Sequence, residues 1–178
     1  MELLLGCGSA RDKRLWVDGK EEWSKLVTLD YNLDHSPDVI WDLRKLPWPF
    51  EDDTFDEVHA YEVLEHLGQQ GDYKAFFAQF SEIWRITKAG GMLFATVPWW
   101  QDEWAWGDPS HTRVITPATL TFLSQIEYEK QVGKTAMSDF RNIYTADFER
   151  AYVEQRDPNL YFALSVVKPS RHRQALPL

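Results

Sequence analysis

The sequence has little cysteine, no long apolar run and few positive charges. Its single cysteine, Cys7, excludes an internal disulfide and a four-cysteine zinc site, and we expect no metal site in this chain. No run approaches the ~18 apolar residues that a membrane span requires. The opening Met-Glu-Leu-Leu-Leu-Gly also lacks the basic leader of a signal peptide. We therefore expect a cytoplasmic protein with no membrane segment.

The shortage of positive charge argues against some kinds of binding partner. Lys and Arg total 19 against 28 Asp and Glu, which gives a formal net charge of −9. An acidic surface works against attraction to phosphate backbones and anionic membranes. A nucleic-acid substrate is therefore not expected, and the charge alone leaves the oligomeric state open.

Enough apolar residues are present for one sizeable domain. Hydrophobic residues make up 44% of the 178-residue chain, and a chain of this length is typical of a single domain. No linker, repeat or low-complexity tract interrupts residues 1–168, which we take as that domain. Residues 169–178 are predicted to be a flexible tail; a basic anchor built on Arg171, His172 and Arg173 is the functional alternative.

Short apolar runs recur along the first half of the chain, and turn-rich or helical stretches separate them. Near-continuous apolar runs of this kind are typical of strands buried on both faces of a parallel sheet. Five such runs predict five strands: Leu3–Leu5, Leu26–Leu29, Val39–Trp41, Phe55–Ala60 and Met92–Val97.

Two stretches carry helix signals. Aromatic and aliphatic residues recur at helical spacing over Tyr73–Trp84, with Asp72 as a cap. Gly90 is expected to end that helix, because glycine is the residue that most often follows a helix. Thr116-Pro117 predicts a second helix start, with a capping side chain followed by proline in the first turn.

The end of the chain and one short connection complete the predicted fold. Tyr152-Val153 and Leu160–Val167 flank Asp157-Pro158-Asn159, a pattern typical of a hairpin. Only residues 31–37 separate Asp30 from Asp38, whereas a helical crossover needs about a dozen residues or more. We therefore predict an α/β fold with a mostly parallel sheet, an antiparallel C-terminal edge hairpin, and a sheet trimmed between the second and third strands.

Three successive strand ends carry residues suited to one ligand. Gly6-Cys7-Gly8 directly follows the first run, and glycine lets the backbone turn sharply and a ligand approach closely. Asp30 ends the second run, 22 residues after Gly8, where an acid can accept hydrogen bonds from ribose hydroxyls. Asp42-Leu43 ends the third run. Plain turns and solvated caps are the alternatives for each alone; together they favour a nucleoside-like ligand.

The same region argues against a pyrophosphate ligand. A dinucleotide fingerprint places a third glycine where this chain has Arg11. No Gly-x-x-x-x-Gly-Lys-Ser/Thr phosphate loop occurs in the sequence. A nicotinamide oxidoreductase is therefore a disfavoured alternative, and a nucleoside without phosphates is preferred.

Four motifs in order give residues 3–100 their resemblance to a known family. They are Leu5-Gly6-Cys7-Gly8, the Leu46–Asp56 segment, Val63-Leu64-Glu65-His66, and the Trp84–Gly91 segment. Together they resemble the motifs of class I S-adenosylmethionine-dependent methyltransferases, of the small Rossmann-like, type 11-like subgroup. The resemblance implies a Rossmann-like sheet, S-adenosylmethionine as the cofactor, and methyl transfer as the reaction.

The resemblance also implies roles for matching positions. The two glycines would meet the methionine portion, Asp30 the ribose, and the Asp42-Leu43 pair the adenine, while the end of the fourth strand would lie beside the sulfonium. The implied cofactor-binding residues are Gly6, Cys7, Gly8, Asp30, Tyr31, Asp42, Leu43, Ala60 and Tyr61. Glu65-His66 supports the wall or takes part in chemistry. The family's usual acid is Leu4 here, and Ala89 replaces a usual proline.

Substrate specificity is expected in the tryptophan-rich segment after the fifth strand. Four of the nine tryptophans fall within residues 99–106. With nearby carboxylates they could hold a cationic amine or stack on a sugar or planar ring; a lid whose tryptophans pack against the sheet is the alternative. We predict Trp99, Trp100, Trp104 and Arg113 as substrate-binding residues.

His111 is the candidate catalytic base, because the pKa of an unperturbed imidazole lies near neutrality; a hydrogen-bonded loop anchor is the alternative for this side chain. The hypothesis is a methyltransferase acting on a small-molecule or glycan-type acceptor. A cofactor-binding or interaction module without turnover is the alternative, and the Leu4 substitution and the trimmed sheet are the features that favour it.

Overall fold

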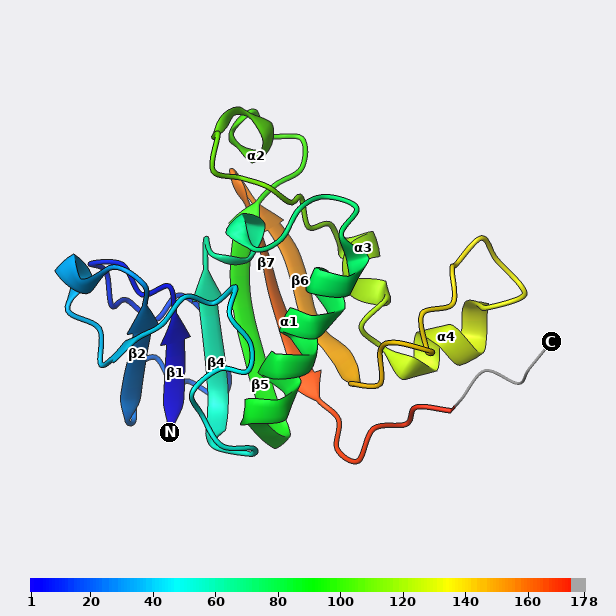
Figure 1. The fold of residues 1–178 in the computed structure, drawn as a ribbon, viewed down its shortest axis with the longest axis horizontal. Coiled ribbons are helices and arrows are strands. Elements are labelled where there is room, and N and C mark those ends of the chain that lie inside the picture. The colour runs from blue at the N-terminus through cyan, green and yellow to red at the C-terminus, as the bar shows by residue number, and fades with distance from the viewer. Residues whose placement is uncertain (174–178) are drawn as a thin grey trace.

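The apolar runs form one seven-stranded sheet, and the computed structural model describes residues 1–173 of the chain (Figure 1). The order of the strands across the sheet is β3-β2-β1-β4-β5-β7-β6. Their bounds are β1 Glu2–Leu5, β2 Leu26–Asp30, β3 Val39–Ile40, β4 Phe55–Tyr61, β5 Thr87–Pro98, β6 Phe148–Arg156 and β7 Asn159–Val166.

The directions of the strands agree with the prediction. Strands β1 to β5 pair in parallel, so their carboxyl ends lie at one edge of the sheet. Strand β7 runs antiparallel to β5, and β6 pairs with β7 as a hairpin. The mostly parallel α/β sheet with an antiparallel C-terminal edge is confirmed.

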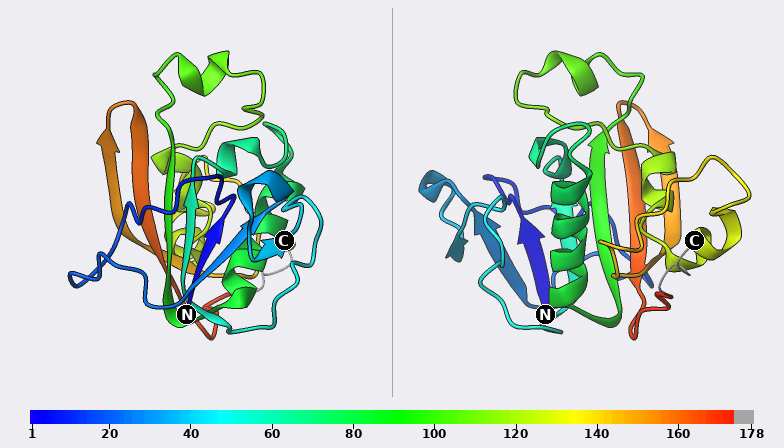
Figure 2. Two further views of the ribbon diagram at one scale, coloured as in Figure 1. Left: turned by 90° about the vertical axis from the view of Figure 1, so that its left-hand side faces the viewer. Right: turned by 45° about the vertical axis from the view of Figure 1, so that its right-hand side comes forward.

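Helices cover one face of this sheet (Figure 2). Two 3₁₀ helices also flank the carboxyl edge. The bounds are η1 Leu33–His35, η2 Leu64–His66, α1 Tyr73–Ile86, α2 Trp104–Gly107, α3 Pro117–Thr121 and α4 Gln125–Gln131. Residues of α1, α3 and α4 share one apolar cluster with β1, β4 and β5, which fixes the helices on that face.

Local signals explain where the helices begin. The Asp72 carboxylate accepts a hydrogen bond from the Ala75 N–H at 3.0 Å, as the cap predicted. Thr116 caps α3 in the same way, with proline in the first turn. The C-terminal signal is wrong: α1 ends at Ile86, and Gly90 lies inside β5 at φ +72°. Pairing of Thr87 with Phe55 draws the chain into the strand before Gly90 is reached.

In the half of the sheet that contains β1, β2 and β3, the segments that connect the strands contain no α-helix. Residues 6–25, between β1 and β2, contain no helix, and residues 31–38 contain only the single turn η1. The predicted trimming between the second and third strands is confirmed. Coil therefore carries the chain past the carboxyl ends of these strands, and side-chain bonds must hold it there.

The second face of the sheet is covered by that coil. Leu4, Cys7, Leu15, Tyr61, Phe94 and Ala163 form a separate apolar cluster on this face. Beside it, the buried Lys13 ammonium lies 2.8 Å from Glu57 and 3.4 Å from Glu2. His59 lies among these groups and is fully buried. This ion cluster fastens the coil to the sheet.

The described part of the C-terminal tail contacts the domain. The Arg171 guanidinium forms an ion pair with the buried Asp147 carboxylate at 2.6 Å, and the Ser170 hydroxyl donates to the Thr145 carbonyl. Residues 174–178 of the predicted flexible tail lie outside the described residues. Among the residues that the structure describes, no helix has both the length and the apolar character needed to cross a membrane.

Candidate functional site

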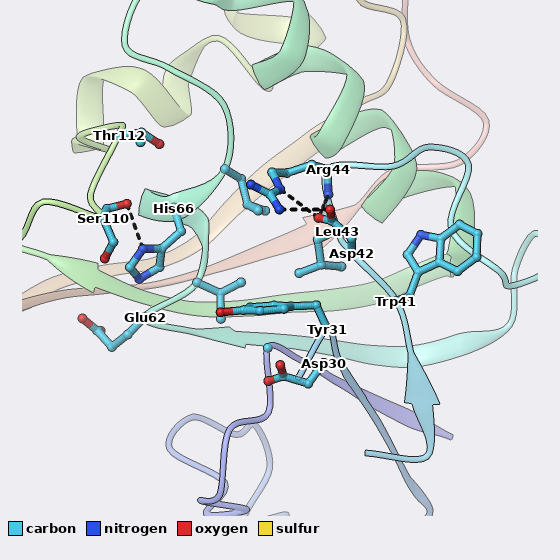
Figure 3. Close-up of a pocket in the computed structure, with 13 residues that line it drawn as sticks. Asp30, Tyr31, Trp41, Asp42, Leu43, Arg44, Glu62, His66, Ser110 and Thr112 are labelled. Carbon is cyan, nitrogen blue, oxygen red and sulfur yellow. Dashed lines mark hydrogen bonds and ion pairs between the residues drawn. The ribbon is translucent and has the colours of Figure 1, made fainter. Parts of the chain in front are cut away.

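A cavity of about 530 Å³ opens at the carboxyl ends of β1, β2 and β4 (Figure 3). Its volume is within the range typical of small-molecule sites. Its walls come from five separate segments of the chain: Gly6, Asp30, Tyr31, Trp41, Asp42, Leu43, Arg44, Glu62, Val63, His66, Leu67, Ser110 and Thr112.

The turn after β1 depends on glycine at two positions. Gly6 and Gly8 have φ values of +55° and +51°, in the left-handed region that glycine adopts most readily. A Cβ atom at Gly6 would lie 2.5 Å from Val63 Cγ2, so the loop after β4 packs directly on this backbone. A Cβ atom at Gly8 would meet no protein atom within 4 Å, so a ligand can approach the chain there.

Asp30 is held rigidly between this turn and the end of β2. Its Oδ2 accepts the Gly8 N–H and its Oδ1 accepts the Asn32 N–H, both at 2.9 Å. The residue is only 6% exposed. Each carboxylate oxygen has two lone pairs, so both oxygens retain capacity for a ligand hydroxyl.

The end of β3 contributes an acid that already has a partner. The Asp42 carboxylate forms a two-pronged pair with the Arg44 guanidinium at 2.9 and 3.0 Å (Figure 3). The hydrogen bonds from Arg44 lower the pKa of Asp42. Tyr31 is 75% exposed at the mouth, and Figure 3 shows its ring between Asp30 and Leu43.

Arg11 has a positioning role that sequence reasoning missed. Its guanidinium donates to the Gly8 carbonyl at 2.6 Å and to the His35 carbonyl at 2.8 Å. These bonds join the turn after β1 to η1. The sequence showed only that Arg11 stands where a dinucleotide site has glycine; the partners come from loops that the fold brings together.

A second, smaller cavity of about 180 Å³ shares Gly6 with the first. Cys7, Gly8, Arg14 and Tyr61 also line it. The Tyr61 hydroxyl accepts the N–H groups of Arg14 and Leu15 at 3.2 Å and bonds to His59 Nδ1 at 2.7 Å. Burial raises the pKa of Tyr61 to about 12, so this hydroxyl is neutral.

The structure thus brings together most of the predicted cofactor-binding residues. Gly6, Asp30, Tyr31, Asp42 and Leu43 line the larger cavity, while Gly6, Cys7, Gly8 and Tyr61 line the smaller one. Ala60 reaches neither and is fully buried in the core. Their roles toward a cofactor stay predictions.

Glu62 and Val63, which follow β4, line the larger cavity and were missed. The signal was available, because the rule that selected Asp30 and Asp42, residues at the carboxyl ends of strands, also selects Glu62. Burial raises the pKa of Glu62. Glu65, one turn further, is 2% exposed, and neither of its carboxylate oxygens has a hydrogen-bond partner. Burial, with the Glu62 charge adding to it, raises the pKa of Glu65 to about 8.

His111 faces the region of η2. Its Nδ1 donates to the Trp104 carbonyl at 2.8 Å, and its ring centroid lies 4.8 Å from that of His66. This bond matches the loop-anchor alternative, and it leaves Nε2 as the ring nitrogen available to an acceptor. The prediction of a base stays open on this geometry.

Arg113 points into the protein. The residue is 7% exposed, and its guanidinium donates to the carbonyls of Leu67, Gln69 and Asp72. It also stacks over the Phe76 ring. These contacts hold the loop between η2 and α1, and they give no structural support to the prediction that Arg113 binds substrate.

The tryptophan-rich segment, residues 99–106, extends beyond the end of β5 and includes α2 (Figure 1). Trp99 packs partly on the core, whereas Trp100, Trp104 and Trp106 are 40%, 62% and 66% exposed. Most of these indoles therefore do not pack against the sheet, and none of the four tryptophans lines the larger cavity, so their role toward a substrate stays a prediction.

The sequence was compared with models of known protein families. Residues 3–95 match the sequence model of a family described as "Methyltransferase domain", which is more than half of the chain. No protein with a curated description matches.

Solved structures share the fold at low identity. A SAM-dependent methyltransferase from Archaeoglobus fulgidus is 16% identical with a TM-score of 0.57, over 92% of this chain and 85% of that one. An S-adenosylmethionine-dependent methyltransferase from Mesorhizobium loti is 15% identical with a TM-score of 0.53, over 92% and 90%. A complex of the Haloferax volcanii Trm112 methyltransferase activator with a putative methyltransferase matches at 16% and 0.54, over 93% and 82%. At these identities the similarity shows the fold.

Proposed function

This chain belongs to the family of methyltransferase domains, as its four motifs predicted, and from that premise we propose that it transfers a methyl group from S-adenosylmethionine to a small-molecule or glycan-type acceptor. The observation that carries the proposal is the convergence of Gly6, Asp30, Asp42 and Leu43 on one cavity. Residues from three separate strand ends meet there, with only the 3₁₀ turn η1 in the connections between them.

The residues present fit this cofactor. The open backbone at Gly8 and the free lone pairs of Asp30 suit close approach and ribose hydroxyls. Leu43 and Tyr31 offer apolar and aromatic surface for a purine. In the smaller cavity, Arg14 is the cation that would take the carboxylate of the amino-acid portion.

When bound, S-adenosylmethionine supplies a sulfonium-linked methyl group that is already electrophilic. The chain must therefore align an acceptor and exclude water, and alignment can lower a barrier by ~7–11 kcal/mol. Glu62 places a buried carboxyl on the cavity wall, where a cationic ligand stabilises its ionised form. The lone pair of His111 Nε2 is available for the proton of a protonated acceptor.

A cofactor-binding module without turnover is the second candidate. Two features favour it. The Asp42 carboxylate is already engaged by Arg44, and Leu4 is a buried apolar residue where the related family has an acid. Such a module would bind the cofactor yet transfer nothing.

Calorimetry with S-adenosylmethionine and S-adenosylhomocysteine tests the proposal. We expect binding of both, and we expect Asp30→Ala to weaken it roughly 10–100-fold, because hydrogen bonds to a charged group contribute about 1.5–3 kcal/mol. Asp34→Ala is the matched control, since Asp34 lies in the same loop and is exposed. Absence of heat and of any thermal shift at millimolar ligand would remove the proposal.

A methyl-transfer screen separates the two candidates. Amines, sugars and peptides are incubated with the protein and the cofactor, and products are detected by the mass of one added methyl group. Transfer to any class supports the enzyme. Tight cofactor binding with a blank screen would instead favour the non-catalytic module.

A further inference from the structure

Three metal-ligating side chains converge beside the larger cavity, and one of them, His66, lines its wall. They are Glu65 and His66 of η2 and His111 of the loop that follows α2. One carboxylate oxygen of Glu65 and one ring nitrogen from each histidine all lie within 4.8 Å of one another. His111 follows Glu65 by 46 positions in the sequence, so it is the fold that brings the three residues together.

Both imidazoles are oriented as in a metal site. His66 Nδ1 donates to the Ser110 carbonyl at 3.0 Å, and His111 Nδ1 donates to the Trp104 carbonyl at 2.8 Å. A carbonyl only accepts, so each Nδ1 carries a proton, and in the neutral ring Nε2 is the atom with a lone pair for a metal. Donation of the second ring N–H to a carbonyl is the usual second-shell arrangement of metal-bound histidine.

Glu65 supplies an unsatisfied carboxyl group to the same place. The residue is 2% exposed, both of its carboxyl oxygens lack a hydrogen-bond partner, and its Oε1 lies 4.0 Å from His66 Nε2. A buried polar group without a partner is costly and uncommon in native proteins. Asp108 adds negative charge nearby, with its Oδ2 at 3.8 Å from His111 Nε2.

We propose that Glu65, His66 and His111 form a binding site for a first-row divalent cation, with Zn²⁺ the best fit. Two imidazole nitrogens and one carboxylate oxygen, with one position left open, match the donor set of catalytic zinc sites. Tetrahedral ligands at zinc distances lie roughly 3.4 Å apart. The 4.0 Å separation of Glu65 and His66 therefore needs to shrink by only a fraction of an ångström.

A second group of the same residue types shows what excludes a cation. Glu2, Glu57 and His59 also lie within reach of one another. There, however, the Lys13 ammonium lies 2.8 Å from Glu57 and already supplies the positive charge. Both nitrogens of His59 are also engaged, by Tyr61 and Glu57. Neither condition holds at Glu65, and this contrast singles out the η2 site.

The open position has a consequence for the acceptor, and this part rests on the proposed function. His66, Ser110 and Thr112 line the larger cavity, so the three ligands lie beside it, and the proposal places the open position on that side. A hydroxyl bound to the cation would lose its proton more readily, and that proton would pass to solvent water. Its oxygen would then form the bond to the methyl carbon as the carbon–sulfur bond breaks and the electron pair passes to sulfur. The cation thus replaces His111 as the activating group and points to a hydroxyl acceptor.

Metal binding by the full chain is measurable without cofactor or acceptor. Chelator-treated protein is titrated with Zn²⁺ by calorimetry, and with Co²⁺ by the visible absorption of its tetrahedral complexes. We expect one tight site, weakened at least about 100-fold in His66→Ala and His111→Ala, since even second-shell changes cost 10–100-fold. His172→Ala is the control, because this histidine bonds the Arg141 carbonyl away from the site.

Several results would overturn the site. These are the absence of Zn²⁺ binding, binding that His111→Ala leaves unchanged, or binding that His172→Ala removes. Circular dichroism shows whether the alanine variants fold. If one does not, Glu65→Gln, which keeps size and polarity, tests the carboxylate instead. Unchanged Zn²⁺ affinity in Glu65→Gln also counts against the site. Failure of S-adenosylmethionine binding would leave the Zn²⁺ result intact. Faster transfer to hydroxyl acceptors with Zn²⁺ than without it supports the mechanistic part, and equal or slower transfer refutes it.

Discussion

At the scale of the residue, the two glycines of the first turn serve different purposes. Gly6 is required by packing, because Val63 occupies the space that a side chain would need. At Gly8 nothing in the protein lies near the position of the absent Cβ, so packing does not require glycine there, and we expect the ligand to require it. Both residues have a positive φ, so backbone strain is common to the two positions and only the packing differs.

Alanine substitutions separate these two requirements. We expect Gly6→Ala to cost about 2–4 kcal/mol of unfolding free energy, from overpacking plus left-handed strain, and Gly8→Ala only about 1 kcal/mol from strain. Gly8→Ala should nevertheless weaken S-adenosylmethionine binding at least about tenfold. Urea unfolding and calorimetry on the same samples check both quantities. Equal stability losses, or unchanged affinity in Gly8→Ala, would contradict this division.

At the scale of the element, the tryptophan-rich segment is an appendage on the sheet. It extends past β5 and presents three indoles to solvent, while the backbone carbonyl of Trp104 orients His111. Its side chains thus contribute little to the core, and its main chain contributes to the site. An element of this kind can change its side chains for a new acceptor without loss of the fold.

Trp104→Ala tests that separation. The side chain is 62% exposed, so we expect a change below about 0.5 kcal/mol in unfolding free energy. Loss of an aromatic contact worth about 1–2 kcal/mol should lower kcat/KM for the acceptor roughly 5–30-fold. Trp16→Ala, at another exposed tryptophan, is the control. Unchanged kcat/KM would show that Trp104 does not touch the acceptor.

The fold could be predicted at this scale because apolar runs and turn residues are local signals. Strands, the C-terminal hairpin and the missing crossover all follow from short stretches. Gly90 shows the limit. Its helix-ending signal is real, yet pairing of Thr87 with Phe55, a contact between distant residues, ends α1 earlier.

The candidate site also has a part that could be predicted from the sequence and a part that could not. Asp30 and Asp42 could be found because each follows its own apolar run and parallel strands bring such ends together. The partners of Arg11, the three carbonyls bound by Arg113 and the approach of His111 to Glu65 could not. Those contacts join loops, and loop geometry depends on the whole structure rather than on a local pattern.

At the scale of the whole molecule, the two faces of the sheet are stabilised by different means. Helices and an aromatic core cover one face. Coil covers the other and is held by Lys13, Glu57 and the buried His59, with Trp23 edge-on to the imidazole at 4.8 Å. Stability of the second face therefore depends on charge state, and so on pH.

Burial lowers the pKa of His59 below its ordinary value of 6.5, although Glu57 opposes the shift. A lowered folded-state pKa contributes stability that is complete above pH 6.5 and is lost as pH falls below it. We expect the wild type to lose about 1 kcal/mol more than His59→Gln between about pH 7.5 and pH 5.5. Urea unfolding at both pH values measures this. Parallel losses in the two proteins would show that His59 is not the titrating group.

The missing helices around β1 and β2 also set the electric field of the site. A helix that begins at the carboxyl end of a strand points the positive end of its macrodipole at the ligand, which favours anions. In the described residues 6–25 no helix does so, and the carboxylates of Asp30 and Glu62 face the space instead. Since Arg44 on the same wall is already paired with Asp42, we expect these acids to favour an onium ion over a phosphate.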